Sequence, residues 1–200
     1  SGDLPAIMPL LQEITAITKA NDVPMNVWVG GNGFTAGTAI FSVGYESVAA
    51  RAAATSRLMA AKGWWDVNRK MREHVLSSEP DTIMNYVRGG SMGAAIPVGT
   101  IVQTSQFYLA QGADFMGALK WANEFAELHT KETGVEANIV HTIYGVLGGM
   151  GMIMGYPNAE AIDASRAKSQ ASAEWMTKYF EAGKFAMAGT VMARLMTKVA

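Results

Sequence analysis

Two stretches of the chain make the same transition from an apolar run to an alanine-rich segment. The first is AGTAIFSVGYESVAARAAA, residues 36–54, and the second is LGGMGMIMGYPNAEAIDAS, residues 147–165. In both, Gly-Tyr closes the apolar run, and the two tyrosines, Tyr45 and Tyr156, lie 111 positions apart. The coincidence raises the question of an internal repeat, which decides how every other segment is interpreted.

Further identities share this offset. They are Gly37 with Gly148, Gly44 with Gly155, Trp64 with Trp175, and Asp3 with Asp114. Asp3 and Asp114 each precede a helical pattern, as a helix N-cap does. Within those patterns the apolar stripes also coincide, since Leu10, Ile14 and Ile17 match Trp121, Phe125 and Leu128. These matches predict a tandem duplication, with repeat 1 in residues 1–91 and repeat 2 in residues 92–200.

The second repeat shows the full order of elements. Its β-rich segments predict strands, and its apolar spacing of three and four predicts helices. The expected elements are strand 98–109, helix 114–132, strand 136–144, strand 150–156, a helix from the Asn158 cap to about residue 180, and strand 190–199. This is the β-α-β-β-α-β order of a ferredoxin-like unit. The glycine-rich segments join strand to strand, so we interpret them as turns and not as phosphate-binding loops.

The first repeat follows the same order with one element missing. We expect helix 4–20, strands 25–29 and 38–43, helices 46–61 and 64–76, and strand 82–88. The matching first strand would lie some eleven residues before Ser1, and it is central in this fold. We therefore expect that the natural chain is longer, or that another segment, such as a strand of a neighbouring copy, fills the gap.

Two long uncharged runs indicate how the sheets are covered. Residues 23–45 and residues 137–159 contain no charged side chain, and each spans a central hairpin. A sheet with one wet face alternates apolar and polar residues, and these runs do not. Helices cover only one face, so we predict that the other face packs against a second sheet.

The predicted architecture resembles that of a known superfamily. Two ferredoxin-like units packed sheet to sheet are similar to the dimeric α+β barrel superfamily, here as a tandem-duplicated pseudo-dimeric barrel. The resemblance rests on the element order and on the repeated junctions Gly44-Tyr45 and Gly155-Tyr156. The chain also resembles duplicated marine-metagenome proteins without an assigned function. The superfamily includes cofactor-independent monooxygenases, isomerases, haem-binding proteins and proteins with no known activity, and fold alone does not choose among them.

Composition excludes several classes of function. Only 16% of residues are charged, and the net charge is −1. The charges are evenly spread, so no basic face for nucleic acid can form. There is no cysteine, which excludes disulfides and thiolate sites. The longest uncharged run, residues 89–113, is too polar to span a bilayer. We predict a cytoplasmic protein without a membrane segment, and the low charge favours a homo-oligomer.

An apolar pocket between sheet and helices is the site that the sequence favours. His141 lies within a strand among apolar neighbours, where an imidazole is either a core residue or a pocket residue that exchanges protons. Other aromatic and polar residues could line the same pocket with His141: Tyr144, Gln103, Trp28, Tyr45 and Tyr156. Such a pocket suits a small apolar or aromatic ligand.

The remaining histidines receive other interpretations. His74 follows Trp64 by ten residues, a spacing similar to that of haem-degrading members of the superfamily, but the corresponding position after Trp175 is Phe185. Trp64 and His74 are therefore weak haem-type candidates, and a surface histidine is the simpler interpretation of His74. His129 is expected to close a helix as a cation that complements the helix dipole. No spacing of ligands indicates a metal site.

Two classes of function follow. The first is a small-molecule binding protein or a cofactor-independent enzyme of the monooxygenase or isomerase kind, with His141 and Tyr144 as its polar groups. The second is a non-catalytic assembly protein whose scarce charge reflects burial between subunits. Haem binding is a distant third, and no other cofactor is predicted.

Overall fold

The computed structural model describes residues 4–75, 81–90 and 96–200. The chain is of the α+β class and forms two compact units. Unit 1 contains residues 1–79, 91–99 and 196–200, and unit 2 contains residues 80–90 and 100–195. These units differ from the two predicted repeats, because each repeat's last strand pairs within the other unit. The repeat boundary at residue 91 itself stays a prediction.

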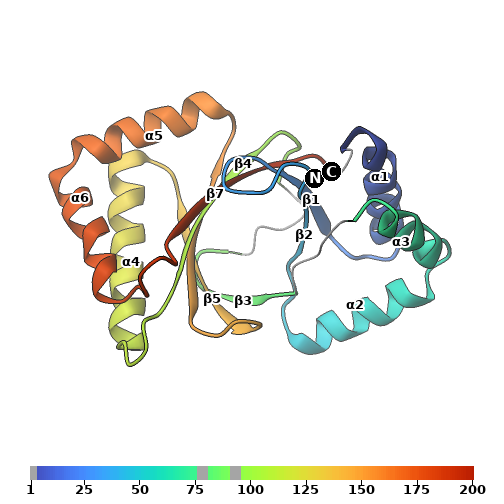
Figure 1. Ribbon diagram of the computed structural model, residues 1–200, viewed down its shortest axis with the longest axis horizontal. Helices are drawn as coiled ribbons and strands as arrows, with labels where there is room; N and C mark the ends of the chain where they lie inside the picture. Colours follow the sequence, from blue (N-terminus) through green and yellow to red (C-terminus); the bar gives the residue numbers. More distant parts are fainter. Residues whose placement is uncertain (1–3, 76–80, 91–95) are drawn as a thin grey trace. The chain divides into compact units, whose positions relative to one another are not determined.

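Unit 1 combines a small antiparallel sheet with three helices (Figure 1). Its elements are α1 (Leu4–Ala20), β1 (Met25–Gly30), β2 (Ala39–Val43), α2 (Val48–Ala60), α3 (Trp64–Arg72) and the end of β7 (Met192–Lys198). Strand β1 pairs with β2 on one side and with β7 on the other. Helices α1 and α3 lie side by side, and their apolar faces form one core with Val27 of β1. The predicted N-cap Asp3 and the predicted helix end Leu76 lie outside the described residues.

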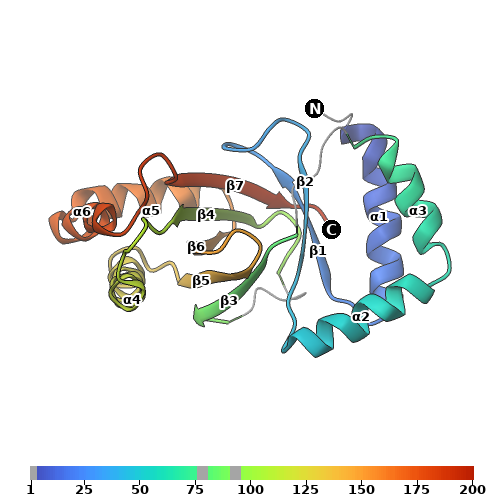
Figure 2. The ribbon, with the colours of Figure 1, turned by 60° about the horizontal axis from the view of Figure 1, so that its bottom comes forward.

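Unit 2 is a complete ferredoxin-like unit with one added strand (Figure 2). Its elements are β3 (Ile83–Arg88), β4 (Ile101–Tyr108), α4 (Phe115–Thr133), β5 (Ala137–Tyr144), β6 (Gly149–Tyr156), α5 (Ala159–Ala171), α6 (Ala173–Phe180), the short 3₁₀ helix η1 (Glu181–Lys184) and the start of β7. The strands follow the order β7-β4-β6-β5-β3. The predicted element order of the second repeat is therefore confirmed.

One predicted helix is corrected. The expected single helix from Asn158 to about residue 180 is two helices, because the backbone is extended at Ser172 (φ −90°, ψ 110°). The Ser172 hydroxyl accepts a hydrogen bond from the Trp175 backbone N–H, so it acts as the N-cap of α6. The break turns α6 so that it packs on α4.

The core of unit 2 lies between its sheet and its helices. Alternate residues of β6, Met150, Met152 and Met154, point to the helices and are at most 9% exposed. Trp121 and Phe125 of α4 stack on each other with ring centroids 5.5 Å apart and lie over this strand face. The three methionines therefore fill the core, which is the usual role of buried methionine side chains.

Candidate functional site

The strand register of unit 2 decides which polar residues face the helices. On β6, Met150 and Met154 face the helix layer. Their cross-strand partners share that face, so His141, opposite Met150, and Gln103, opposite Met154, also face the helices. This is the side of the sheet on which the sequence predicted a pocket.

His141 lies at the border of the packed core. Its ring meets the ring of Phe115, the first residue of α4, edge to face with centroids 5.7 Å apart. Met150 on the neighbouring strand is buried, whereas Phe115 is 39% exposed. The imidazole is half-buried itself, so one side touches apolar groups while the other reaches solvent.

Asn85 is a neighbour of His141 that sequence reasoning missed. It is the cross-strand partner of His141 on β3, so both side chains lie on the helix-facing side of the sheet, with Cβ atoms about 5 Å apart. The carboxamide is exposed and offers both a donor and an acceptor. We call His141, Asn85 and Phe115 the imidazole shelf. Its chemistry is a proton-exchanging ring, a hydrogen-bonding amide and an aromatic face.

Two other predicted pocket residues lie apart from this shelf. Tyr144 is three positions after His141, and strand alternation places it on the opposite face, where it is 57% exposed. Gln103 lies on the same face as His141. Its cross-strand partner Met154 is opposite Ala137, which is four residues from His141 along β5. The structure therefore does not bring these three side chains together.

Tyr156 is a core residue. It is 2% exposed, and its hydroxyl lies 3.5 Å from both the Ser165 hydroxyl and the Met154 sulfur. Burial raises the pKa of the phenol, and the Ser165 hydroxyl opposes this in part. These contacts anchor α5 to β6.

Trp28 and Tyr45 belong to unit 1. Trp28 is 1% exposed, and its indole N–H donates to the Ser42 hydroxyl over 2.8 Å, which links β1 to β2. Tyr45 packs against the small core around Val23, Ala54 and Leu58. Partial burial raises its pKa, against the opposing charges of two arginines.

The weak haem-type candidates also lie in unit 1. Trp64 begins α3 and packs against both apolar cores of the unit. His74 lies in the turn after α3 and is half-buried, and its backbone N–H donates to the Met71 carbonyl. Trp64 thus has a packing role, and the two residues lie at opposite ends of α3.

The interpretation of His129 as a dipole-compensating cation is wrong. Helix α4 continues to Thr133, and His129 is 4% exposed beneath α6. Its Nδ1 accepts a hydrogen bond from the Trp175 indole over 3.2 Å. Burial lowers the pKa of the imidazole to about 4, so the ring is neutral at pH 7. The signal was available in sequence, because His129 continues the buried stripe of Trp121 and Phe125.

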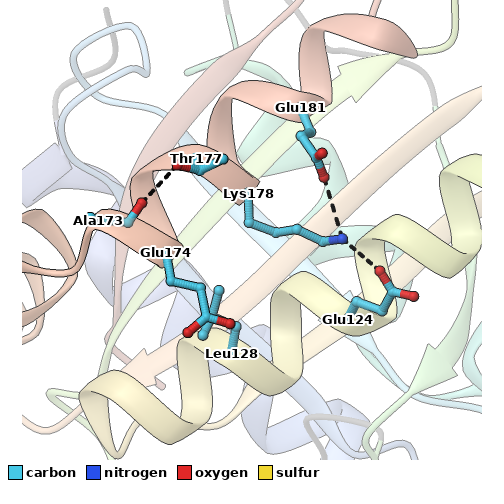
Figure 3. Close-up of a pocket in the computed structure, with 7 residues that line it drawn as sticks. All are labelled: Glu124, Leu128, Ala173, Glu174, Thr177, Lys178 and Glu181. Carbon is cyan, nitrogen blue, oxygen red and sulfur yellow. Dashed lines mark hydrogen bonds and ion pairs between the residues drawn. The ribbon is translucent and has the colours of Figure 1, made fainter.

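A surface groove of about 510 Å³ lies between α4 and α6 (Figure 3). The Lys178 ammonium lies at its centre, 2.6 Å from Glu124 and 3.3 Å from Glu181. The hydrogen bond to Glu124 is the main reason why the pKa of Lys178 is raised, and the same bond lowers the pKa of Glu124. The charges of Lys178, Glu124 and Glu181 pair with one another, so they fasten α6 to α4.

A membrane-spanning helix is not found among residues 4–75, 81–90 and 96–200, where every helix is too short or too polar for that role.

Comparisons with known proteins place the fold. No model of a known protein family matches the sequence, and no curated protein does. A candidate monooxygenase from Fusobacterium nucleatum has a similar crystal structure, with a TM-score of 0.62, 8% identity, and coverage of 97% of this chain and 87% of that one. An anthrone oxidase-like protein gives a TM-score of 0.60 at 12% identity, covering 96% and 84%.

A third structure, a candidate monooxygenase from Lactobacillus acidophilus, gives a TM-score of 0.51 at 12% identity, covering 94% of this chain and 86% of that one. At such identities the likeness is one of fold alone, and it extends over nearly the whole chain. The α+β, ferredoxin-like class that the sequence predicted is therefore confirmed.

Proposed function

We propose that this chain binds a small, largely aromatic molecule at the imidazole shelf of unit 2 and acts on it as a cofactor-independent enzyme of the monooxygenase or isomerase kind. The observation that carries the proposal is the position of His141. It is a half-exposed imidazole on an apolar sheet face, beside an aromatic ring and an amide. Apolar surfaces with a few convergent polar groups are typical of small-molecule sites.

The chemistry follows from the three groups. The Phe115 ring supports an aromatic substrate, and the Asn85 amide donates to an oxygen of that substrate. The imidazole of His141 removes a proton from an acidic C–H or O–H group, because histidine exchanges protons near neutral pH. The resulting enolate is the common starting point for isomerisation and for reaction with dioxygen.

The names of the structural neighbours favour the oxygen reaction as the version to test. Anthrone is a suitable probe, since loss of one of its CH₂ protons gives an aromatic enolate. Reaction with one O₂ then gives anthraquinone and one H₂O, so that dioxygen supplies the oxidant. The scheme needs no bound cofactor.

We expect the purified protein to accelerate anthraquinone formation, followed by absorbance against the uncatalysed reaction in air. His141→Gln should lower the rate about 100-fold or more, the usual range for removal of a general base. Asn85→Ala should lower it less, because it removes one hydrogen bond. His74→Gln is the matched control and should leave the rate unchanged. Full activity in His141→Gln would refute the assignment.

A second candidate, the oligomeric assembly protein, is favoured by a different observation. Large apolar side chains are exposed near the ends of α4 and α6, where Met116 and Phe180 are each 69% exposed and Met187 is 45% exposed. Sedimentation of the wild type and of Phe180→Glu separates the two candidates. A wild-type oligomer that the variant breaks, together with no effect of His141→Gln on any probe, would favour assembly.

A further inference from the structure

Unit 2 shows what a complete sheet of this kind contains. Strand β4 lies between β6 and β7. It pairs with β6 over eight positions, from Ile101 opposite Tyr156 to Tyr108 opposite Gly149. The Leu109 N–H donates to the Gly148 carbonyl, so Leu109 and Gly148 form a hydrogen-bonded pair. Hydrogen-bonded pairs recur at every second position of an antiparallel ladder, so the β6 amides that face β4 are those of Met150, Met152 and Met154.

The described part of unit 1 contains a counterpart of β6 and no counterpart of β4. With the 111-residue offset, Met150, Met152 and Met154 correspond to Ala39, Phe41 and Val43 of β2. Among the strands that the structure describes, β2 lies at the edge of the sheet with β1 as its neighbour.

Hydrogen bonding within unit 1 identifies the same three amides independently. The Gly30 N–H donates to the Thr38 carbonyl, so the bonded pairs of β1 and β2 fall at every second position from Thr38. The backbone groups of Ala39, Phe41 and Val43 therefore point away from β1. A row of outward amides on an edge strand is a template for another strand.

The exposed fraction of Phe41 also indicates that β2 has an uncovered edge. Phe41 lies on the helix-facing side of β2, as its partner Val27 does, and is 41% exposed. Its counterpart Met152 in the complete unit is 9% exposed. A neighbouring strand beside β2 would cover Phe41 as β4 covers Met152.

We propose that β2 binds an extended strand, antiparallel to it and paired with residues 38–45, which the polypeptide ahead of α1 supplies. The position of α1 identifies this occupant. Helix α1 corresponds to α4, because Leu10, Ile14 and Ile17 match Trp121, Phe125 and Leu128 at the 111-residue offset. Strand β4 comes directly before α4 in the chain. The occupant of the β2 edge therefore corresponds to β4 and leads into α1.

Hydrogen exchange on the 200-residue chain and on an extended chain tests this. The extended chain carries a copy of residues 100–113 joined ahead of Ser1, which reproduces the β4-to-helix junction. The matched control carries the same copy with proline at the positions equivalent to Gln103 and Ser105, whose amides face β6 and whose loss prevents pairing.

We expect the amides of Ala39, Phe41 and Val43 to exchange at least 100-fold faster than those of Met150, Met152 and Met154 in the 200-residue chain. The extension should slow the first set at least 10-fold, and the proline control should not.

Three results would overturn the proposal. One is equal protection of the two sets in the 200-residue chain, because the edge would then already be covered. Another is an extension that protects no better than its proline control. The third is protection of the 200-residue chain that rises with protein concentration, which would make a second copy the occupant.

Discussion

His129 shows how one buried side chain makes the stability of unit 2 depend on pH. The neutral ring accepts from the Trp175 indole, and its pKa is lowered to about 4 because it is buried. The unfolded chain, with a histidine pKa near 6.5, therefore binds the proton first as the pH falls. The free energy of unfolding should decrease from about pH 6.5 down to about pH 4, by about 3 kcal/mol in total.

Urea unfolding at pH 7 and pH 4.5 measures this loss. His129→Gln removes the titration, so the variant should lose less stability between the two pH values than the wild type, whatever its stability at pH 7. His74→Gln is the control and should behave as the wild type does. Parallel losses in the wild type and His129→Gln would show that protonation of His129 carries no cost.

Sequence reasoning singled out His141 but did not predict which side chains lie beside it. His141 stood out as an imidazole within an apolar strand, but its proposed partner Tyr144 is an odd number of positions away and so lies on the other face. Asn85 could not be predicted. Its proximity to His141 depends on the pairing of β3 with β5, two strands that lie far apart in the sequence.

The division between α5 and α6 depends on one capping side chain. Because Ser172 caps α6, Ser172→Ala should lower the free energy of unfolding by about 1 kcal/mol. Ser172→Asp should retain most of the stability, since aspartate is an equally good N-cap. Chemical unfolding followed by tryptophan fluorescence tests this, and an alanine variant as stable as the wild type would contradict it.

Helices and strands were predictable where their pattern was strong. Helix α1 spans the predicted residues 4–20, because its apolar spacing and the turn at Asn21 and Asp22 agree. The joint at Ser172 was missed because it contains neither Gly nor Pro. The Ser172 hydroxyl can cap a new helix, or the first helix can continue through Ser172. The packing of α6 on α4 favours the capped, divided form.

The chain forms two compact units whose boundaries differ from those of the predicted repeats. Strand β3, the last strand of repeat 1, pairs with β5 in unit 2, and the end of β7 pairs with β1 in unit 1. A repeat found by offset cannot predict this exchange, because pairing between distant strands leaves no local signal. Among the described residues of unit 1 no strand corresponds to β4, which is the element that the offset predicted to be missing.

The function proposed for the whole molecule depends on where a ligand binds, and its three histidines report on this directly. The measurement is a proton–carbon NMR spectrum of the imidazole rings during titration with anthrone under nitrogen, which prevents oxidation. We expect the His141 resonances to shift and saturate, while those of buried His129 and of His74 stay in place. A spectrum in which His141 does not move, or in which only His74 moves, would contradict the imidazole shelf as the site.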